Sequence, residues 1–83
     1  MYTILIVDDE RPAQTFLKAI CQKYCPAFDT ILLSGSADDA LRLMAQQHVH
    51  VLVTDISMPG INGIELAQRV RQLYPRTHTV IVS

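Results

Sequence analysis

The 83-residue sequence has no long hydrophobic run, no block of like charge and no basic N-terminal segment. Its first apolar segment, residues 3–7, ends at three acidic residues and is too short for a membrane span or the core of a signal peptide. We therefore expect a cytoplasmic protein. The net charge of −1, without a basic patch, argues against direct contact with nucleic acid or with an anionic membrane surface.

Cysteine and glycine are scarce, and each shortage excludes a class of site. The two cysteines, Cys21 and Cys25, are four residues apart on a predicted helix, and no second pair completes a zinc site. That spacing suits a disulfide poorly, so we interpret both as reduced thiols with a packing role. The three glycines form neither a GxGxxG fingerprint nor a P-loop, which excludes nucleotide sites of those kinds.

Hydrophobic residues make up 49% of the chain and charged residues 18%, a composition typical of a globular domain. The length allows at most one domain with a small core. Four short segments rich in β-branched apolar residues predict strands that are buried on both faces of a sheet. These segments are residues 3–7, 30–33, 50–54 and 79–82.

Three segments with helical periodicity separate these strands. The first has Pro12 in its opening turn and ends at Pro26, the second begins at Ser36, and the third begins at Asn62 and ends before Pro75. Their apolar stripes are Ala13, Phe16, Leu17, Ile20 and Tyr24, then Ala40, Leu41 and Met44, then Leu66, Val70 and Leu73. The order βαβαβαβ predicts an α/β fold with a parallel sheet and helices on its faces.

Acidic residues follow two of the predicted strands where these strands end. Asp8 and Asp9 come directly after the first strand, Asp55 after the third, and Ser83 follows the fourth. Ligands of parallel α/β sheets bind outside the carboxyl ends of the strands. If the first and third strands are neighbours, the three carboxylates meet in one crevice.

Three close carboxylates repel one another and must raise their pKa values, gain counter-charges or bind a cation. Both lysines lie inside the first predicted helix, away from the strand ends. Oxygen ligands without histidine or cysteine suit a hard cation such as Mg²⁺, which leaves positions open for phosphoryl oxygens. In the loop behind Asp55, Pro59 restricts the backbone, whereas Gly60 and Gly63 permit backbone conformations that other residues resist. A carboxylate held there beside the cation can act as a nucleophile on phosphorus.

The chain resembles the receiver domain of bacterial two-component response regulators in three ordered motifs: ILIVDDE at residues 4–10, TDISMPGINGIEL at 54–66 and VIVS at 80–83. The resemblance implies a doubly wound, flavodoxin-like parallel sheet of strand order 2-1-3-4-5. It also implies a phosphoacceptor module of a signalling pathway and not an enzyme. Control of transcription through a C-terminal DNA-binding domain is an expectation by analogy with the family.

The resemblance further implies a role for each matching residue. Asp55 is expected to accept a phosphoryl group from the phosphohistidine of a sensor histidine kinase. Asp9 is expected to bind Mg²⁺ directly and Asp8 largely through water, while the backbone carbonyl of Ser57 supplies a further ligand. The hydroxyl of Ser83 is expected to hydrogen-bond the phosphoryl group and couple it to a conformational switch.

The printed sequence stops before the family's fifth strand, with its lysine that contacts the phosphoryl group, and before the last two helices. We therefore expect residues 1–83 to be the N-terminal part of a receiver domain, with strand order 2-1-3-4. The fourth strand then becomes a sheet edge with unpaired backbone groups and apolar side chains. We expect a second chain to cover this edge, which gives a homodimer or a larger assembly.

Other interpretations of the same residues exist. Asp8 and Asp9 can act as N-caps of the first helix, and Glu10 is predicted to support the helix start. His48, His50 and His78 lie near strand starts, at the opposite end of the sheet from the acids, and are predicted to be surface residues.

Two rival functions remain on these grounds. The first is a catalytically silent receiver-like interaction module whose acidic residues no longer act. The second is a phosphohydrolase with an aspartyl nucleophile, but such enzymes place two aspartates in one DxD loop after the first strand, whereas Asp8 and Asp9 are adjacent here.

Overall fold

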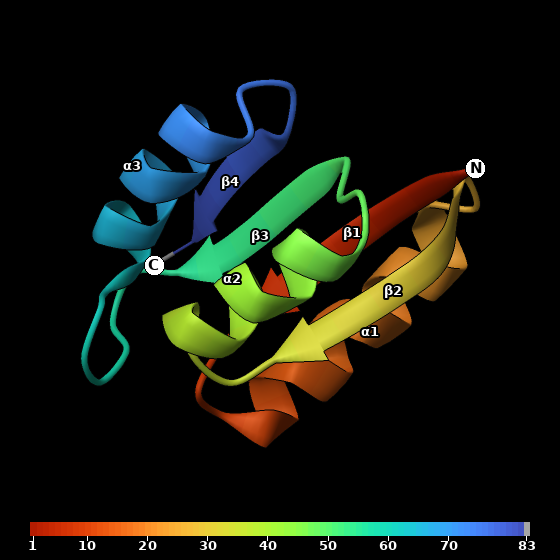
Figure 1. The fold of residues 1–83 in the computed structure, drawn as a ribbon. Coiled ribbons are helices and arrows are strands. Elements are labelled where there is room, and N and C mark those ends of the chain that lie inside the picture. The colour runs from red at the N-terminus through yellow and green to blue at the C-terminus, as the bar shows by residue number, and fades with distance from the viewer. Residues whose placement is uncertain (83) are drawn as a thin grey trace.

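The computed structural model describes residues 1–82, in which strands and helices alternate along the chain (Figure 1). The elements are β1 (Tyr2–Val7), α1 (Arg11–Tyr24), β2 (Phe28–Ser34), α2 (Ala37–Gln46), β3 (Val51–Asp55), α3 (Gly63–Leu73) and β4 (His78–Val82). Each predicted strand and helix is present, so the βαβαβαβ order is confirmed.

The four strands form one parallel sheet in the order β2-β1-β3-β4. This is the predicted doubly wound arrangement, in which the chain first adds a strand on one side of β1 and then crosses to the other side. In the register of the sheet, Val7 at the end of β1 lies opposite Ser34 of β2 and Thr54 of β3. Residues that follow β1 and β3 therefore emerge side by side at the carboxyl end of the sheet.

Two helices begin at the polar residues that the sequence predicts. The side chain of Ser36 accepts a hydrogen bond from the backbone N–H of Asp39 at 3.1 Å, and that of Asn62 accepts one from Glu65 N–H at 2.9 Å. Such N-caps satisfy backbone donors that have no partner within the helix. Helix α1 begins differently, because its N-cap residue Glu10 makes no side-chain cap bond.

The hydrophobic core lies between the sheet and the helices α2 and α3, which pack against each other on one face. Its buried residues are Leu5, Val7, Ala37, Ala40, Met44, Val49, Leu52, Met58, Leu66 and Val70. Helix α1 covers the opposite face, behind β1 and β2 in Figure 1. No helix within residues 1–82 is long and apolar enough to cross a membrane.

Two of the predicted apolar stripes are only partly buried. In α1, Phe16 is 65% exposed and Tyr24 69% exposed, since this helix packs only on β1 and β2 among the described elements and its flank stays uncovered. The inward position predicted for Leu73 is wrong, because Leu73 is 61% exposed and Tyr74 packs against the core instead.

Candidate functional site

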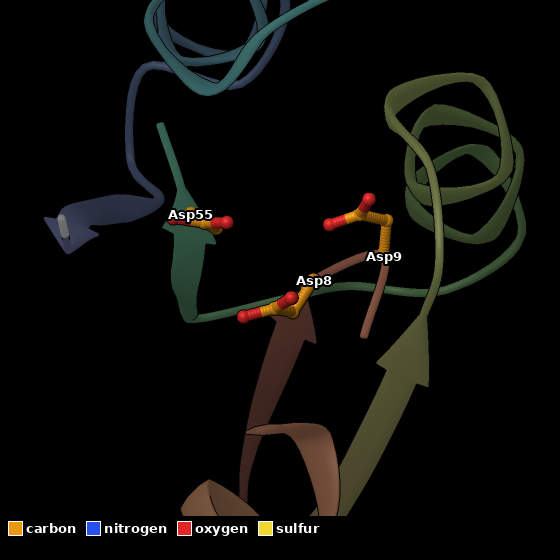
Figure 2. Close-up of side chains that lie close together, drawn as sticks. All are labelled: Asp8, Asp9 and Asp55. Carbon is orange, nitrogen blue, oxygen red and sulfur yellow. The ribbon is translucent and has the colours of Figure 1, made fainter. Parts of the chain in front are cut away.

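Three carboxylates point toward a common space at the carboxyl end of the sheet (Figure 2). Asp8 follows β1, Asp9 comes next before α1, and Asp55 is the last residue of β3. One oxygen atom of each carboxylate lies within 4.8 Å of the other two. The direct pairing of β1 with β3 produces this convergence, which the sequence predicts from strand ends alone.

The three acidic side chains differ in burial. Asp8 is buried, Asp55 is half-buried and Asp9 is exposed. The Oδ1 atom of Asp8 accepts a hydrogen bond from the backbone N–H of Glu10 at 2.9 Å, which fixes the side chain at the turn into α1. The alternative that Asp8 and Asp9 are N-caps of α1 is therefore wrong, because the N-cap position belongs to Glu10.

The negative charge of this cluster has no cationic side chain paired with it in the described part of the chain. The ion pairs within residues 1–82 are Arg42 with Asp39 at 2.6 Å and Arg69 with Glu65 at 3.6 Å. The cluster instead offers three carboxylate oxygens at a spacing that one cation can bridge. Hard cations such as Mg²⁺ prefer this all-oxygen set of ligands, so the residues fit the ion that the sequence predicts.

The loop after β3 forms one wall of an open hollow of about 570 Å³ beside the acids. Met58 anchors this loop because its side chain is buried in the core, whereas Ser57 is exposed. The residues that line the hollow are Asp9, Glu10, Asp55, Ile56, Ser57, Met58, Pro59 and Asn62. Ser57 thus borders the same space as two of the carboxylates, while Ser83 lies outside the described residues and its role stays a prediction.

Two glycines shape the same loop for different reasons. Gly60 has a φ of +76°, a conformation that side-chain-bearing residues rarely adopt, as the sequence predicts. Gly63 is the first residue of α3, and its N–H donates to the Ile56 carbonyl at 2.9 Å. A Cβ atom on Gly63 would overlap the carbonyl oxygen of Asp55. Glycine is therefore required here because α3 approaches β3 closely, and not because of an unusual φ.

Sequence reasoning missed the contribution of Gln14, in the first half of α1. Its side-chain Nε2 donates to the Asp8 carbonyl at 2.6 Å and to the Ser34 carbonyl at 3.1 Å. No motif marks this residue, and only the helical register that places it beneath the strand ends could have indicated it. Gln14 thereby joins α1 to the ends of both β1 and β2.

A second polar group near the site is internally paired. Asp39 of α2 accepts hydrogen bonds from Arg42 and from the buried hydroxyl of Ser34, the latter at 2.8 Å. The Arg42 hydrogen bond, followed by the Ser34 hydrogen bond, lowers the pKa of Asp39 below its ordinary value. The backbone N–H of Asp39 donates to the Ser36 side chain at the start of α2, while its carboxylate turns toward Ser34 and Arg42.

The histidines occupy the opposite end of the sheet, as predicted, but the surface position predicted for His50 is wrong. His50 is half-buried, and its Nδ1 accepts the backbone N–H of Thr3 at 3.0 Å. Its ring lies edge-on to those of Tyr2 and His48, with centroids 5.1 and 4.3 Å away. Burial, and then the nearby charge of His48, lowers the pKa of His50.

The two cysteines are free thiols and half-buried. Burial raises the pKa of the Cys21 thiol, and the neighbouring Cys25 raises it further. A raised pKa keeps a thiol protonated and weakly nucleophilic at neutral pH.

Comparison with known proteins matches residues 4–83 to a family model described as the response regulator receiver domain. The hydrogenase transcriptional regulatory protein HoxA of Cupriavidus necator is 33% identical over 81 residues, which cover 98% of this chain and 16% of HoxA. The autoinducer 1 sensor kinase/phosphatase LuxN of Vibrio harveyi is 30% identical over 82 residues, which cover 98% of this chain and 9% of LuxN. The chain thus spans only a small part of both relatives.

A similar solved structure agrees with the geometry of the sheet. The response regulator protein TrrA of Thermotoga maritima, in complex with Mg(2+)-BeF, superposes with a TM-score of 0.88 at 28% identity, covering 98% of this chain and 68% of that one. The family match over nearly the whole chain, the sheet order and the relatives together show that this chain belongs to the response regulator receiver domain family of two-component systems.

Proposed function

We propose that this receiver domain accepts a phosphoryl group on the carboxylate of Asp55 from the phosphohistidine of a sensor histidine kinase. The observation that carries the proposal is that Asp55 ends β3 with an oxygen within 4.8 Å of Asp8 and Asp9 oxygens. An Asp55 oxygen attacks phosphorus, and the phosphorus–nitrogen bond breaks. The bonding electron pair stays with the histidine nitrogen, which takes up a proton, and an acyl phosphate forms on Asp55.

The backbone on both sides of Asp55 is tied down, which favours a fixed direction for its side chain. Thr54 is fully buried, and its hydroxyl donates to the Asp55 carbonyl at 3.1 Å. The next residue, Ile56, donates its N–H to the Val82 carbonyl of β4 at 3.1 Å. A nucleophile held in this way needs little reorganisation before it attacks, because its orientation does not have to be found in the reaction.

Mg²⁺ is the cation that this proposal assigns to the acidic cluster. Asp9 would bind it directly and Asp8 largely through water, with Asp55 and the backbone carbonyl of Ser57 as further ligands. When bound, the ion neutralises the carboxylates and offers positions for phosphoryl oxygens. Support comes from the all-oxygen cluster and from TrrA, which was solved in complex with Mg(2+)-BeF.

Intact-mass spectrometry after incubation with Mg²⁺ and acetyl phosphate tests the proposal. The purified chain should gain one phosphoryl mass, which hydroxylamine should remove because it cleaves acyl phosphates. Asp55→Asn should abolish the gain, whereas Asp29→Asn, at an exposed position of β2, should leave it intact. Labelling that survives in Asp55→Asn would overturn the assignment, and a wild-type chain that never labels would favour the silent interaction module.

The assignment of the phosphodonor and of the output rests on relatives. LuxN is a sensor kinase/phosphatase and HoxA a transcriptional regulatory protein, and each contains a segment similar to this chain. We infer a histidine kinase as donor and control of transcription as output, through a DNA-binding domain that follows the receiver in the full protein.

Each of these two inferences has its own test. Transfer of label from a panel of kinases autophosphorylated with radioactive ATP tests the donor. Coding DNA after the Ser83 codon that lacks a DNA-binding domain would overturn the output.

We also infer that the 83-residue polypeptide associates through β4. Within residues 1–82 this strand pairs only with β3, and Val80 and Ile81 are 47% and 40% exposed. An apolar strand with one unpaired edge is a template for pairing with another chain. Analytical ultracentrifugation should show dimers or larger species that Val80→Lys shifts toward monomer. A wild-type chain that stays monomeric at high micromolar concentration would contradict this inference.

A further inference from the structure

Gln14 connects helix α1 to the backbone that carries two of the three clustered carboxylates. Its half-buried side-chain amide donates to the Asp8 carbonyl at 2.6 Å and to the Ser34 carbonyl at 3.1 Å. The Asp8 N–H in turn donates to the same Ser34 carbonyl at 3.0 Å. One amide group therefore closes a small network across the ends of β1 and β2.

The Asp8 carbonyl lies outside the hydrogen-bond ladder of α1. The N-cap residue of this helix is Glu10, and its carbonyl accepts the first helical bond, from the Gln14 N–H at 3.2 Å. Asp8 precedes this N-cap by two residues, so the helix ladder does not reach its carbonyl. The side chain of Gln14 donates to that carbonyl instead.

The Asp8 carbonyl is part of the peptide group that joins Asp8 to Asp9. A hydrogen bond to this carbonyl restrains the plane of that peptide, and hence the direction in which the Asp9 side chain leaves the backbone. The Asp8 side chain is restrained separately by the Glu10 N–H. Because Asp8, Asp9 and Asp55 carry like charges within 4.8 Å, the backbone needs such restraints to keep the cluster together without a cation.

We propose that Gln14 is a positioning residue for the acidic cluster, which holds the Asp8–Asp9 peptide so that both carboxylates are oriented to bind Mg²⁺. The inference rests on the proposed function, since it concerns the cation used for phosphorylation of Asp55. Residues that orient metal ligands through hydrogen bonds typically contribute about 10- to 100-fold to metal affinity. In this proposal Gln14 acts through the Asp8 carbonyl and is not itself a ligand.

The test is an Mg²⁺ titration of the purified chain, followed through the backbone amide resonances of Asp8, Asp9 and Glu10. Gln14→Met keeps the length of the side chain but removes both donors, and it should weaken Mg²⁺ binding by about 10-fold or more. Gln22→Met makes the same change at an exposed position of the same helix and should leave the affinity unchanged.

The phosphorylation rate with acetyl phosphate, measured across Mg²⁺ concentrations, separates positioning from a loss of fold. Gln14→Met should need more Mg²⁺ to reach half of its maximal rate, while the maximal rate stays close to that of the wild type. Unchanged Mg²⁺ affinity in Gln14→Met would overturn the inference and leave the phosphoacceptor function standing. A wild-type chain that takes up neither Mg²⁺ nor the phosphoryl group would overturn both.

Discussion

The two ends of the sheet use polar side chains in opposite ways. At the amino end, the Nδ1 atom of His50 accepts a hydrogen bond from the backbone N–H of Thr3. This bond joins β1 to the residue that precedes β3. At the carboxyl end of the same two strands, Asp8, Asp9 and Asp55 bring three like charges within 4.8 Å of one another. The first arrangement satisfies a backbone group, whereas the second leaves charge that is not compensated within the described residues.

This difference separates a structural polar group from one that is arranged for a ligand. A polar side chain that pairs with the backbone stabilises the fold and has no further need of a partner. Carboxylates that converge oppose folding until a cation or a proton reduces their repulsion. The comparison thus indicates that the carboxyl end is where binding, and not folding, determines the choice of residues.

Gly63→Ala should lower the stability of the protein most, through the carboxyl end of the sheet. The added Cβ would overlap the Asp55 carbonyl oxygen, so α3 and the end of β3 must move apart. We expect the free energy of unfolding to fall by about 3 kcal/mol, at the upper end of the usual range for overpacking. Helix propensity alone predicts a gain from the same change, so the sign of the effect in urea unfolding tests the close contact.

Gly35→Ala is the matched control for this glycine. The nearest atoms to a Cβ at position 35 are the Gln14 Nε2 at 3.9 Å and the Asp8 carbonyl oxygen at 4.0 Å, which is ordinary contact. We expect a change within about 0.5 kcal/mol. Equal stability of the Gly63→Ala and wild-type chains would show that α3 does not rest on Asp55.

Asp55→Asn should make the carboxyl end more like the amino end, because it reduces the charge that lacks a partner there. Removing one of three like charges relieves repulsion of about 1 kcal/mol per pair at these distances in a water-like medium, so the metal-free variant should unfold at a higher temperature. Added Mg²⁺ should stabilise the wild type more than the variant, since the variant has lost a ligand. Thermal unfolding with EDTA and with Mg²⁺ measures both effects, and Asp29→Asn should reproduce neither.

The histidine at the amino end predicts a pH dependence of stability. Burial lowers the pKa of His50, the charges of His48 and of the N-terminal amine lower it further, and Asp29 opposes them. The unfolded chain therefore binds the proton more tightly than the folded chain. The stabilisation is complete above the ordinary histidine pKa of 6.5 and is lost as the pH falls through the lower pKa of the folded state.

Urea unfolding between acidic and neutral pH measures this step. Protonated Nδ1 cannot accept the Thr3 N–H, so the loss should coincide with weaker amide protection of Thr3. His50→Gln should flatten the pH dependence in this range, whereas His78→Gln, at an exposed position on β4, should leave most of it. A wild-type stability that stays constant through this range would contradict the role assigned to His50.

The sequence predicts the strands from their period, while the strand order comes from the resemblance to receiver domains. With β1 and β3 as neighbours, the convergence of the three acids follows from the strand ends. Apolar β-branched runs define the strands, and the carboxyl ends of neighbouring parallel strands meet at one edge. Contacts that depend on exact helix placement are not encoded in such patterns. Gln14 beneath the strand ends and Gly63 against Asp55 belong to this class, and neither has a local signal that distinguishes it from other residues.

The exposed residues of α1 and α3 show a related limit. Helical periodicity identifies an apolar stripe but not how much of that stripe a neighbouring element covers. The stripes therefore predict inward positions for Phe16 and Leu73, which are exposed in the structure. The surface position predicted for His50 is wrong for a different reason. A single polar residue near a strand start gives no sign that its side chain accepts a hydrogen bond from another strand.

Arg42→Gln should have the smallest effect on stability. It compares a paired acid at the carboxyl end, Asp39, with the three clustered acids at the same end. Asp39 is also an acid near this edge, but it is paired with Ser34 and with Arg42, whose side chain is 58% exposed. Exposed ion pairs contribute little, so we expect the free energy of unfolding to fall by less than about 0.5 kcal/mol. Because the pKa of Asp39 is lowered, this contribution is present above the ordinary value of 3.8 and disappears as the pH falls through the folded-state pKa.

High salt should remove most of the difference between Arg42→Gln and the wild type, since it screens exposed charges. Mg²⁺, in contrast, should stabilise both chains equally, because Asp39 lies outside the cluster of Asp8, Asp9 and Asp55. A smaller response to Mg²⁺ in Arg42→Gln would mean that Asp39 and its partners support the cation site as well. A position near the carboxyl edge is therefore not enough to make a carboxylate a ligand. Within residues 1–82, the three clustered acids differ from Asp39 in having no cationic side chain paired with them.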